Sequence, residues 1–365
     1  MVLSSNVDAT NIAKLASDLI RIRSINSSDV KDTHTNAGLY EVAHFVKEWI
    51  SKNSSANVKI VEFKKGFPIV IADGGGNGRK ILLNGHMDVV PVNLKDNKNT
   101  DHFSGKITKN KLLGRGAADM KTGLATFMYI LSKLNDDSAY HLMLTAVSDE
   151  ETGGFRGSRY LAMQFKPDIV FVGEPTTAEF LGVGEKGVLQ LTLKAKGRAV
   201  HSSLPSNGIN AITKITNDLN SIMKIQNYTY RTPLYAKNAV KNSLRIYGED
   251  VRMITCTPSM ISGGTKLNIV PSYCEASVNI RLPVGINVER TMKLTRALIR
   301  ESNVIHVASA EPSYTSNKNL FIKRMLNIDD THMPHIKPII LSGATDGRYF
   351  RYAGVPTVIY GRWKF

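Results

Sequence analysis

The sequence is poor in cysteine and has no long apolar run. Its 365 residues include two cysteines, Cys256 and Cys274, which do not form a Cys-x-x-Cys pair. This favours two reduced, buried thiols. No apolar stretch approaches the ~18 residues of a membrane span, and the N-terminus lacks the basic and apolar regions of a signal peptide. We therefore expect a cytoplasmic protein without membrane contact.

Acidic residues are also scarce, with 31 Asp and Glu against 47 Lys and Arg and a net charge of +16. The stretch from Gly184 to Arg290 contributes much of this excess. A solvated surface explains it most simply, and an anionic small substrate is the second interpretation. Nucleic-acid binding is disfavoured because no basic run with interleaved aromatic residues and no nucleic-acid motif is present.

Two nucleotide or nucleophile signatures are absent. There is no phosphate-binding P-loop and no Gly-x-Ser-x-Gly nucleophile elbow. A Gly-x-Gly-x-x-Gly match begins at Gly182, but a predicted strand follows it rather than the helix that such a motif needs. Without these signatures, the acidic and histidine residues are the main candidates for a functional site.

The length predicts about two domains at roughly 150 residues each. Helices alternate with apolar strands up to residue 183, which predicts an α/β domain with a mostly parallel sheet flanked by helices. From Gly184 the pattern changes to strand, helix, strand, strand. We expect residues 1–183 and 291–365 to form the α/β domain, and residues 184–290 to form an inserted α+β domain.

Acidic or histidine residues follow several of the predicted strands. His86 and Asp88 follow the strand ILL, and their spacing places both side chains on one side of an extended chain. Such a pair suits a metal-binding imidazole supported by a carboxylate, although the motif alone is common. Asp119 precedes a predicted helix, where it could equally serve as an N-cap.

The other two positions carry glutamates. Glu150 and Glu151 follow an apolar strand, and Glu174 directly follows the strand IVFVG. Adjacent carboxylates at a buried sheet end repel each other and need a cation. The alternative is that Glu150 and Glu151 lie in a solvated loop and bind nothing. Ligands of open α/β sheets bind at the carboxyl ends of strands. Together the motifs predict a site for Zn²⁺, Co²⁺ or Mn²⁺, with one or two ions.

In this order, the motifs NGHMDVVP, GRGAADMKTG, SDEETGG and VGEPT resemble the metal-site motifs of a co-catalytic zinc family. That family includes succinyl-diaminopimelate desuccinylase, acetylornithine deacetylase, aminoacylase and glutamate carboxypeptidase. The segments GRAVHSSLPSNGINAI, KLNIVP and SGATDGRYF resemble its lid and substrate motifs. The resemblance implies a hydrolase-like catalytic domain with an inserted lid that forms a homodimer, and a small anionic N-acyl amino acid or short peptide as substrate.

The resemblance also implies a role for each matching residue. His86 binds one metal and Asp88 orients it, Asp119 bridges two metals and is often followed by a cis peptide, and Glu150 is the general base. Glu151 binds the second metal and Glu174 the first. His201 reaches across the dimer to the partner's site. The implied substrate-binding residues are Asn268, Arg281, Gly343 and Arg348.

The sequence departs from the family in one important place. The family has a last histidine ligand after its final strand, whereas no histidine follows His335 in this sequence. We expect one metal site to be retained and the second to be weak or empty. Leu267, Lys186 and Ala344 also differ from the desuccinylase pattern. The predicted function is amide hydrolysis by a deacylase or desuccinylase; a carboxypeptidase or dipeptidase, or a catalytically impaired homologue, are the alternatives.

Overall fold

The computed structural model describes residues 7–26, 36–92, 101–109, 111–133, 139–328 and 335–361. The chain divides into two compact units. The first comprises Met1–Gly182, Asn317–Lys337 and Thr345–Phe365, and the second comprises Val183–Ser316 and Pro338–Ala344. Within the described ranges, every helix is too short or too polar to cross a bilayer.

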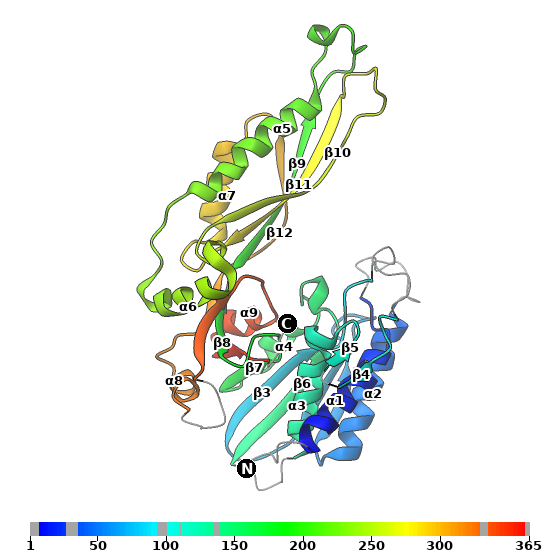
Figure 1. Cartoon of the computed structure of the whole chain (residues 1–365), viewed down its shortest axis with the longest axis vertical. Helices are drawn as coiled ribbons and strands as arrows, with labels where there is room; N and C mark the ends of the chain where they lie inside the picture. Colours follow the sequence, from blue (N-terminus) through cyan, green and yellow to red (C-terminus); the bar gives the residue numbers. More distant parts are fainter. Residues whose placement is uncertain are drawn as a thin grey trace. The chain divides into compact units, whose positions relative to one another are not determined.

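The first unit is built on a mixed sheet (Figure 1). Its helices are α1 (Val7–Arg21), α2 (Ala37–Asn53), α3 (Thr122–Ser132), α4 (Ser158–Gln164), α8 (Leu320–Leu326) and α9 (Gly347–Tyr352). Its strands are β1 (Asn57–Val61), β2 (Ile69–Asp73), β3 (Arg79–His86), β4 (Lys106–Thr108), β5 (Lys111–Leu113), β6 (Tyr140–Val147), β7 (Ile169–Val172) and β15 (Thr357–Ile359), with β8 (Phe180–Glu185) crossing into the second unit.

The strands of this sheet follow the order β1-β2-β6-β3-β7-β15-β8. The pairs β3–β6, β3–β7 and β7–β15 are parallel. The pairs β1–β2, β2–β6 and β8–β15 are antiparallel. The α/β class is confirmed, but the sheet is mixed rather than mostly parallel, because short connections such as that from β1 to β2 allow only antiparallel pairing.

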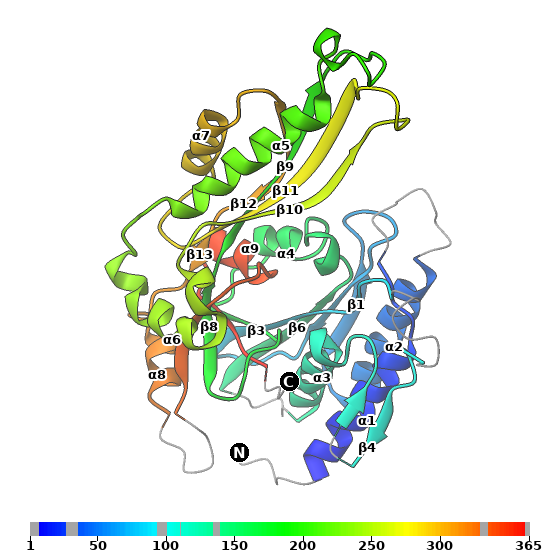
Figure 2. The ribbon, with the colours of Figure 1, turned by 45° about the horizontal axis from the view of Figure 1, so that its top comes forward.

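The core of the first unit lies between the sheet and three helices. Leu15 and Leu19 of α1 and Val46 and Ile50 of α2 are buried, at spacings of four residues that place each pair on one helix face. They pack with β2, β3 and β6 and with α3. Figure 2 shows α1, α2 and α3 on one side of the sheet, with α4 and α9 on the other. The carboxyl ends of β3 and β7 are thereby held in a rigid framework.

The second unit contains a four-stranded antiparallel sheet on which two helices pack. Its elements are β9 (Gly187–Lys196), α5 (Ala211–Ile222), α6 (Lys237–Tyr247), β10 (Thr255–Gly263), β11 (Tyr273–Leu282), α7 (Val288–Leu298), β12 (Asn303–Ala310), β13 (Ser313–Tyr314) and most of β14 (Lys337–Leu341). The order β10-β11-β9-β12 is antiparallel throughout. Alternate residues of β9 are buried against α5 and α7, as its alternating sequence predicts.

The second unit extends beyond the inserted domain expected at residues 184–290. Strand β12 pairs with β9, and α7 packs on the same sheet, so residues 291–316 cluster with it. The apolar side chains Leu294 and Leu298 of α7 join the core that Leu189 and Leu191 form in β9. Because burial of this helix face keeps α7 in the second unit, the chain returns to the first unit only after Ser316, later than expected.

Candidate metal centre

His86 is the last residue of β3, and its side chain is 1% exposed. Its Nδ1 atom lies 2.9 Å from the backbone oxygen of Asp88 and 3.5 Å from the Oδ1 atom of that residue. The imidazole is therefore held from the Nδ1 side, chiefly by the Asp88 main chain. The Nε2 atom faces the carboxylates of Asp119 and Glu174.

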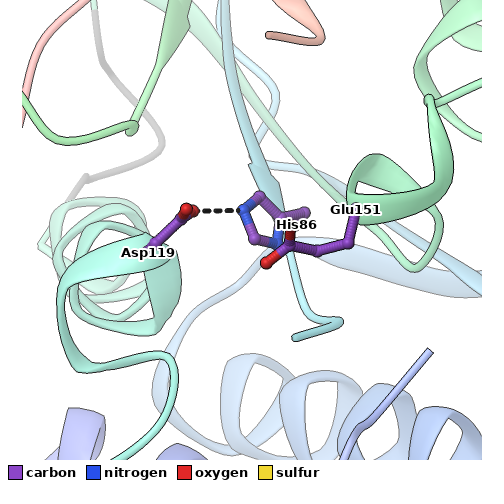
Figure 3. Close-up of side chains that lie close together, drawn as sticks. All are labelled: His86, Asp119 and Glu151. Atoms are coloured by element: carbon purple, nitrogen blue, oxygen red, sulfur yellow. Dashed lines mark hydrogen bonds and ion pairs between the residues drawn. The ribbon is translucent and has the colours of Figure 1, made fainter. Parts of the chain in front are cut away.

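Asp119 lies in the short helical turn Ala117–Lys121 that precedes α3. Its Oδ1 atom lies 2.9 Å from Nε2 of His86. Figure 3 marks this contact with a dashed line. The helix α3 begins later, at Thr122, and no side-chain cap forms there, so Asp119 is not an N-cap. The Asp119–Met120 peptide bond is cis, as the resemblance implied.

Glu150 and Glu151 lie in a turn after β6, in Glu150–Thr152. The backbone amides of both residues donate to the carboxylate of Asp88, at 3.3 and 3.2 Å respectively. Asp88 is fully buried and thus links the end of β3 to this turn. One carboxylate therefore fixes the positions of both glutamates relative to His86.

The ligand atoms fall into two overlapping groups. His86, Asp119 and Glu151 offer atoms within 4.8 Å of one another, and His86, Glu150 and Glu174 do the same. Figure 3 shows the first of these groups. Glu174 follows β7, is 5% exposed, and places Oε1 3.4 Å from Nε2 of His86. The two adjacent glutamates thus belong to different groups.

This concentration of carboxyl groups shifts the pKa values of its members. Burial lowers the pKa of His86, but hydrogen bonds to Asp119, Asp88 and Glu174 outweigh it and hold that pKa well above its ordinary value. Burial raises the pKa of Glu151 and of Glu174 to about 7. Burial and the charge of Glu174 raise the pKa of Glu150 well above its usual range. The centre therefore favours added positive charge or bound protons.

A divalent cation fits this donor set. One imidazole nitrogen and several carboxylate oxygens are ligands suited to Zn²⁺, Co²⁺ or Mn²⁺. Without a cation, the raised pKa values of His86 and Glu150 favour the protonated forms of both groups. A bound cation would replace those protons and leave the imidazole neutral. Asp119 is 54% exposed, which leaves one side of the centre open to an ion and a substrate.

Several supporting residues were not predicted from the sequence. Asn26 donates to Oδ2 of Asp88 at 3.0 Å, and Lys121 is fully buried with its Nζ atom 2.8 Å from the carbonyl oxygens of Leu19 and Ile22. Burial lowers the pKa of Lys121 to about 7. Lys121 stands two residues after Asp119, inside a recognised motif, but a lysine normally indicates a surface position.

Two buried carboxyl groups close to the glutamate turn were also missed. Asp149 is fully buried and Asp346 is 1% exposed. Burial and the charge of Asp346 raise the pKa of Asp149 to about 7. Burial raises the pKa of Asp346 to about 6, although the Arg348 charge opposes it. Neither was predicted from the sequence: Asp149 precedes Glu150, which already had an expected role, and Asp346 lies two residues before Arg348, which had one too.

The remaining predicted residues are distributed as follows. His201, Asn268, Arg281 and Gly343 belong to the second unit. His201 is exposed, its Nδ1 atom lies 2.7 Å from Oγ of Ser203, and the Asn268 carbonyl accepts from Ser202 at 2.9 Å. Arg281 donates to Asn279 at 3.1 Å, and the backbone at Gly343 has open space beside it. Arg348 belongs to the first unit and is buried.

The chain is similar to curated metallohydrolases along most of its length. It is 27% identical to an uncharacterized metallohydrolase of Methanocaldococcus jannaschii, over 95% of this chain and 91% of that protein. It is 26% identical to a probable succinyl-diaminopimelate desuccinylase of Staphylococcus epidermidis, over 92% of this chain and 85% of that protein. It is 29% identical to an acetylornithine deacetylase of Vibrio atlanticus, over 78% of this chain and 71% of that protein.

Solved structures share the fold at lower identity. An M20 family metallo-carboxypeptidase from Sulfolobus solfataricus matches with a TM-score of 0.76, 19% identity, and coverage of 97% of this chain and 91% of that one. Human carnosine dipeptidase 1 matches with a TM-score of 0.72 and 16% identity, and the match covers 98% of this chain and 90% of that one. The family model described as peptidase family M20/M25/M40 matches residues 82–364, a range that includes every residue of the metal centre. The chain is a hydrolytic enzyme and belongs to the peptidase family M20/M25/M40.

Proposed function

We propose that the protein hydrolyses the amide bond of an N-acyl amino acid in a reaction that depends on Zn²⁺, Co²⁺ or Mn²⁺. The observation that carries this proposal is the convergence of His86, Asp119, Glu150, Glu151 and Glu174 at one edge of the sheet. Relatives named as a desuccinylase and a deacetylase support the acyl amino acid as substrate. The net charge of +16 is consistent with an anionic substrate.

The first cation would be held by His86, Asp119 and Glu174, and a second by Asp119 and Glu151. A cation here supplies Lewis acidity, which polarises the scissile carbonyl and makes water more acidic. Among the described residues, His86 is the only histidine in the two ligand groups. Because the first cation would take this imidazole, only carboxylates remain for the second. We therefore expect the second cation to bind more weakly than the first.

Glu150 is the proposed general base and acid. Its carboxylate would take a proton from the attacking water and later deliver it to the leaving amine. Positive charge nearby lowers the pKa of Glu150, as His86 already does in part, and so favours the carboxylate form that a base requires. Asp88 would keep Glu150 in place through the amide hydrogen bond described above.

His201 is the proposed donor to the oxyanion, acting on the site of a partner subunit. The exposed position of its imidazole suits contact with a second chain. Strand β10 forms one edge of the sheet in the second unit and exposes Met260 and Ile261, at 72% and 59%. Exposed apolar side chains on an edge strand suit pairing between subunits. Asn268 lies beside His201 in the chain fold and is proposed to contact the substrate.

A peptidase reaction is the second candidate. The fold matches include a metallo-carboxypeptidase and a dipeptidase, and both reactions use the same amide chemistry. A panel of succinyl, acetyl and peptidyl amino acids, assayed with added Zn²⁺, Co²⁺ or Mn²⁺, separates the two. Turnover confined to N-acyl amino acids supports the deacylase proposal, and turnover confined to peptides contradicts it. A chain that binds metal but hydrolyses none of these compounds would be a catalytically impaired homologue.

A further inference from the structure

Helix α9 contacts the turn that carries Glu150 and Glu151. Arg348 and Tyr349 lie in its first turn and are 6% and 9% exposed. The Nη2 atom of Arg348 donates to the carbonyl oxygen of Gly153 at 2.6 Å, and the Tyr349 hydroxyl donates to the same oxygen. Two side chains of α9 therefore hold one carbonyl group at the end of the turn.

Gly153 directly follows the turn and is bonded to it. Its amide donates to the carbonyl oxygen of Glu150 at 2.8 Å, and the amide of Gly154 donates to that of Asp149 at 2.7 Å. A shift of the Gly153 carbonyl would disturb these bonds and move the glutamate side chains with the backbone. The position of the turn relative to His86 therefore depends on what holds Gly153.

The guanidinium of Arg348 is engaged elsewhere as well. Its Nη1 atom donates to the carbonyl oxygen of Thr345 at 2.9 Å, and the group lies 4.6 Å from the centre of the Tyr349 ring. An arginine that recognises a carboxylate presents two parallel N–H groups to it. Here a substrate carboxylate would have to displace backbone carbonyls from a buried guanidinium. This arrangement favours a structural partner over a substrate.

Further contacts join the start of α9 to α4 and to the glutamate turn. Oδ2 of Asp346 accepts a hydrogen bond from Oγ of Ser158 at 2.7 Å. A Cβ atom at Gly154 would lie 2.0 Å from Oδ1 of Asp346, and Gly154 has a φ of +68°. The close approach therefore requires glycine at this position. The start of α9 is packed directly on the turn at both Gly153 and Gly154.

We propose that Arg348 is a positioning residue that fixes the turn bearing Glu150 and Glu151 through the Gly153 carbonyl, and does not bind the substrate carboxylate. The inference rests on the proposed function for the roles of the two glutamates. Removal of the guanidinium would loosen the turn and misplace the general base. Misplacement by about 1 Å can lower a rate by about 10²-fold, so the loss should be in kcat rather than in KM.

Hydrogen exchange of the full chain tests the anchoring without any need for activity. In R348Q, amides of residues 148–157 should exchange about tenfold faster than in the parent, with and without added Mn²⁺, because a charged hydrogen bond is lost. Y349F, which removes the second donor, should act in the same direction. R351Q is the matched control, because Arg351 of the same helix donates to the Thr357 carbonyl instead. Unchanged exchange of this segment in both R348Q and Y349F would overturn the proposal.

Kinetics with paired substrates tests the second half of the proposal. An N-acyl amino acid and its α-carboxamide should both lose kcat in R348Q by similar factors, with the ratio of their KM values unchanged. If R348Q instead raises KM for the carboxylate substrate alone and leaves kcat intact, Arg348 binds the carboxylate and the proposal is wrong. If the parent hydrolyses neither compound while the exchange result holds, the proposed function fails and the anchor stands.

Discussion

The Nε2 atom of His86 lies 2.9 Å from Oδ1 of Asp119, although the two residues are 33 positions apart in the chain. His86 ends the central strand β3, and Asp119 precedes helix α3. The sheet and the helix that covers it thus bring an imidazole and a carboxylate together. Glu151 and Glu174 approach the same imidazole from two further segments.

Asp88 should control metal affinity without being a ligand. D88N removes the charge of the carboxylate that accepts from the amides of Glu150 and Glu151, so the support of the glutamate turn is weakened. Loss of such an outer partner typically lowers metal affinity about 10- to 100-fold. Calorimetric titration of the metal-free protein with Mn²⁺ measures this effect.

A matched control for D88N exists elsewhere in the first unit. Asp73 also pairs with a histidine, His141, at 2.6 Å, so D73N removes an equivalent aspartate–histidine contact. D73N should bind Mn²⁺ as the parent does. Equal affinities of D88N and the parent would show that Asp88 does not support the centre.

Glu150 should be needed for turnover but not for tight binding of the first cation. E150Q removes the proton acceptor and retains the size of the side chain, so kcat should fall about 10²- to 10⁴-fold. Metal content, measured by plasma mass spectrometry, should match that of the parent. E48Q, on the exposed side of α2, is the control and should leave kcat unchanged. Parental kcat in E150Q would assign the base to another residue.

His201 should contribute to the rate without affecting the metal. H201A removes the proposed oxyanion donor, and such a loss typically lowers kcat about 10²- to 10³-fold. His306 is exposed on β12 of the same unit, so H306A is a matched control with no expected effect. If both variants retain the parental kcat, His201 is an ordinary surface residue.

The dimer that this role requires can be tested separately. I261E places a charge on the exposed edge strand and should shift the protein to monomers in light scattering. Because His201 would then be lost from the partner's site, kcat should fall with the dimer fraction. A fully active monomer would contradict action across subunits.

The stability of the metal-free protein should fall as the pH rises from 5 to 8. Burial raises the pKa of Glu151 and Glu174 to about 7, against an ordinary value of 4.5. Between these values the folded state keeps protons that the unfolded state has released. The associated stability is complete below pH 4.5 and is lost as the pH passes 7.

Thermal unfolding at several pH values measures this dependence. The double variant E151Q/E174Q should show a smaller fall in Tm between pH 5 and 8 than the parent. Added Mn²⁺ should raise the parental Tm more at pH 8 than at pH 5, since the cation replaces bound protons. The same pH slope in the parent and the double variant would mean that these carboxyl groups are not the cause.

The sequence predicted the strand ends that carry the centre better than it predicted the second unit. The apolar strands before His86 and Glu174 are buried and form β3 and β7, so the positions of these residues followed from local pattern. Strand β12 and helix α6 were missed. Every residue of β12 is partly or fully exposed. Its sequence, NVIHVASA, therefore has only a weak form of the apolar pattern that predicts a buried strand.

The supporting contacts were beyond prediction for a different reason. The bond from Arg348 to Gly153 joins residues 195 positions apart, and that from Ser158 to Asp346 spans 188. Only the tertiary arrangement brings them together, and neither residue type indicates such a partner by itself. Local spacing can nominate groups that carry charge, whereas the contacts that fix their geometry arise from packing of distant segments.

An anomalous difference map from crystals of the zinc-loaded protein tests the central claim most directly. The account predicts a strong peak within bonding distance of Nε2 of His86 and of a carboxylate oxygen of Asp119. A second, weaker peak should lie beside Glu151. Fully loaded crystals with zinc peaks elsewhere, and none that His86 can bind, would contradict the account.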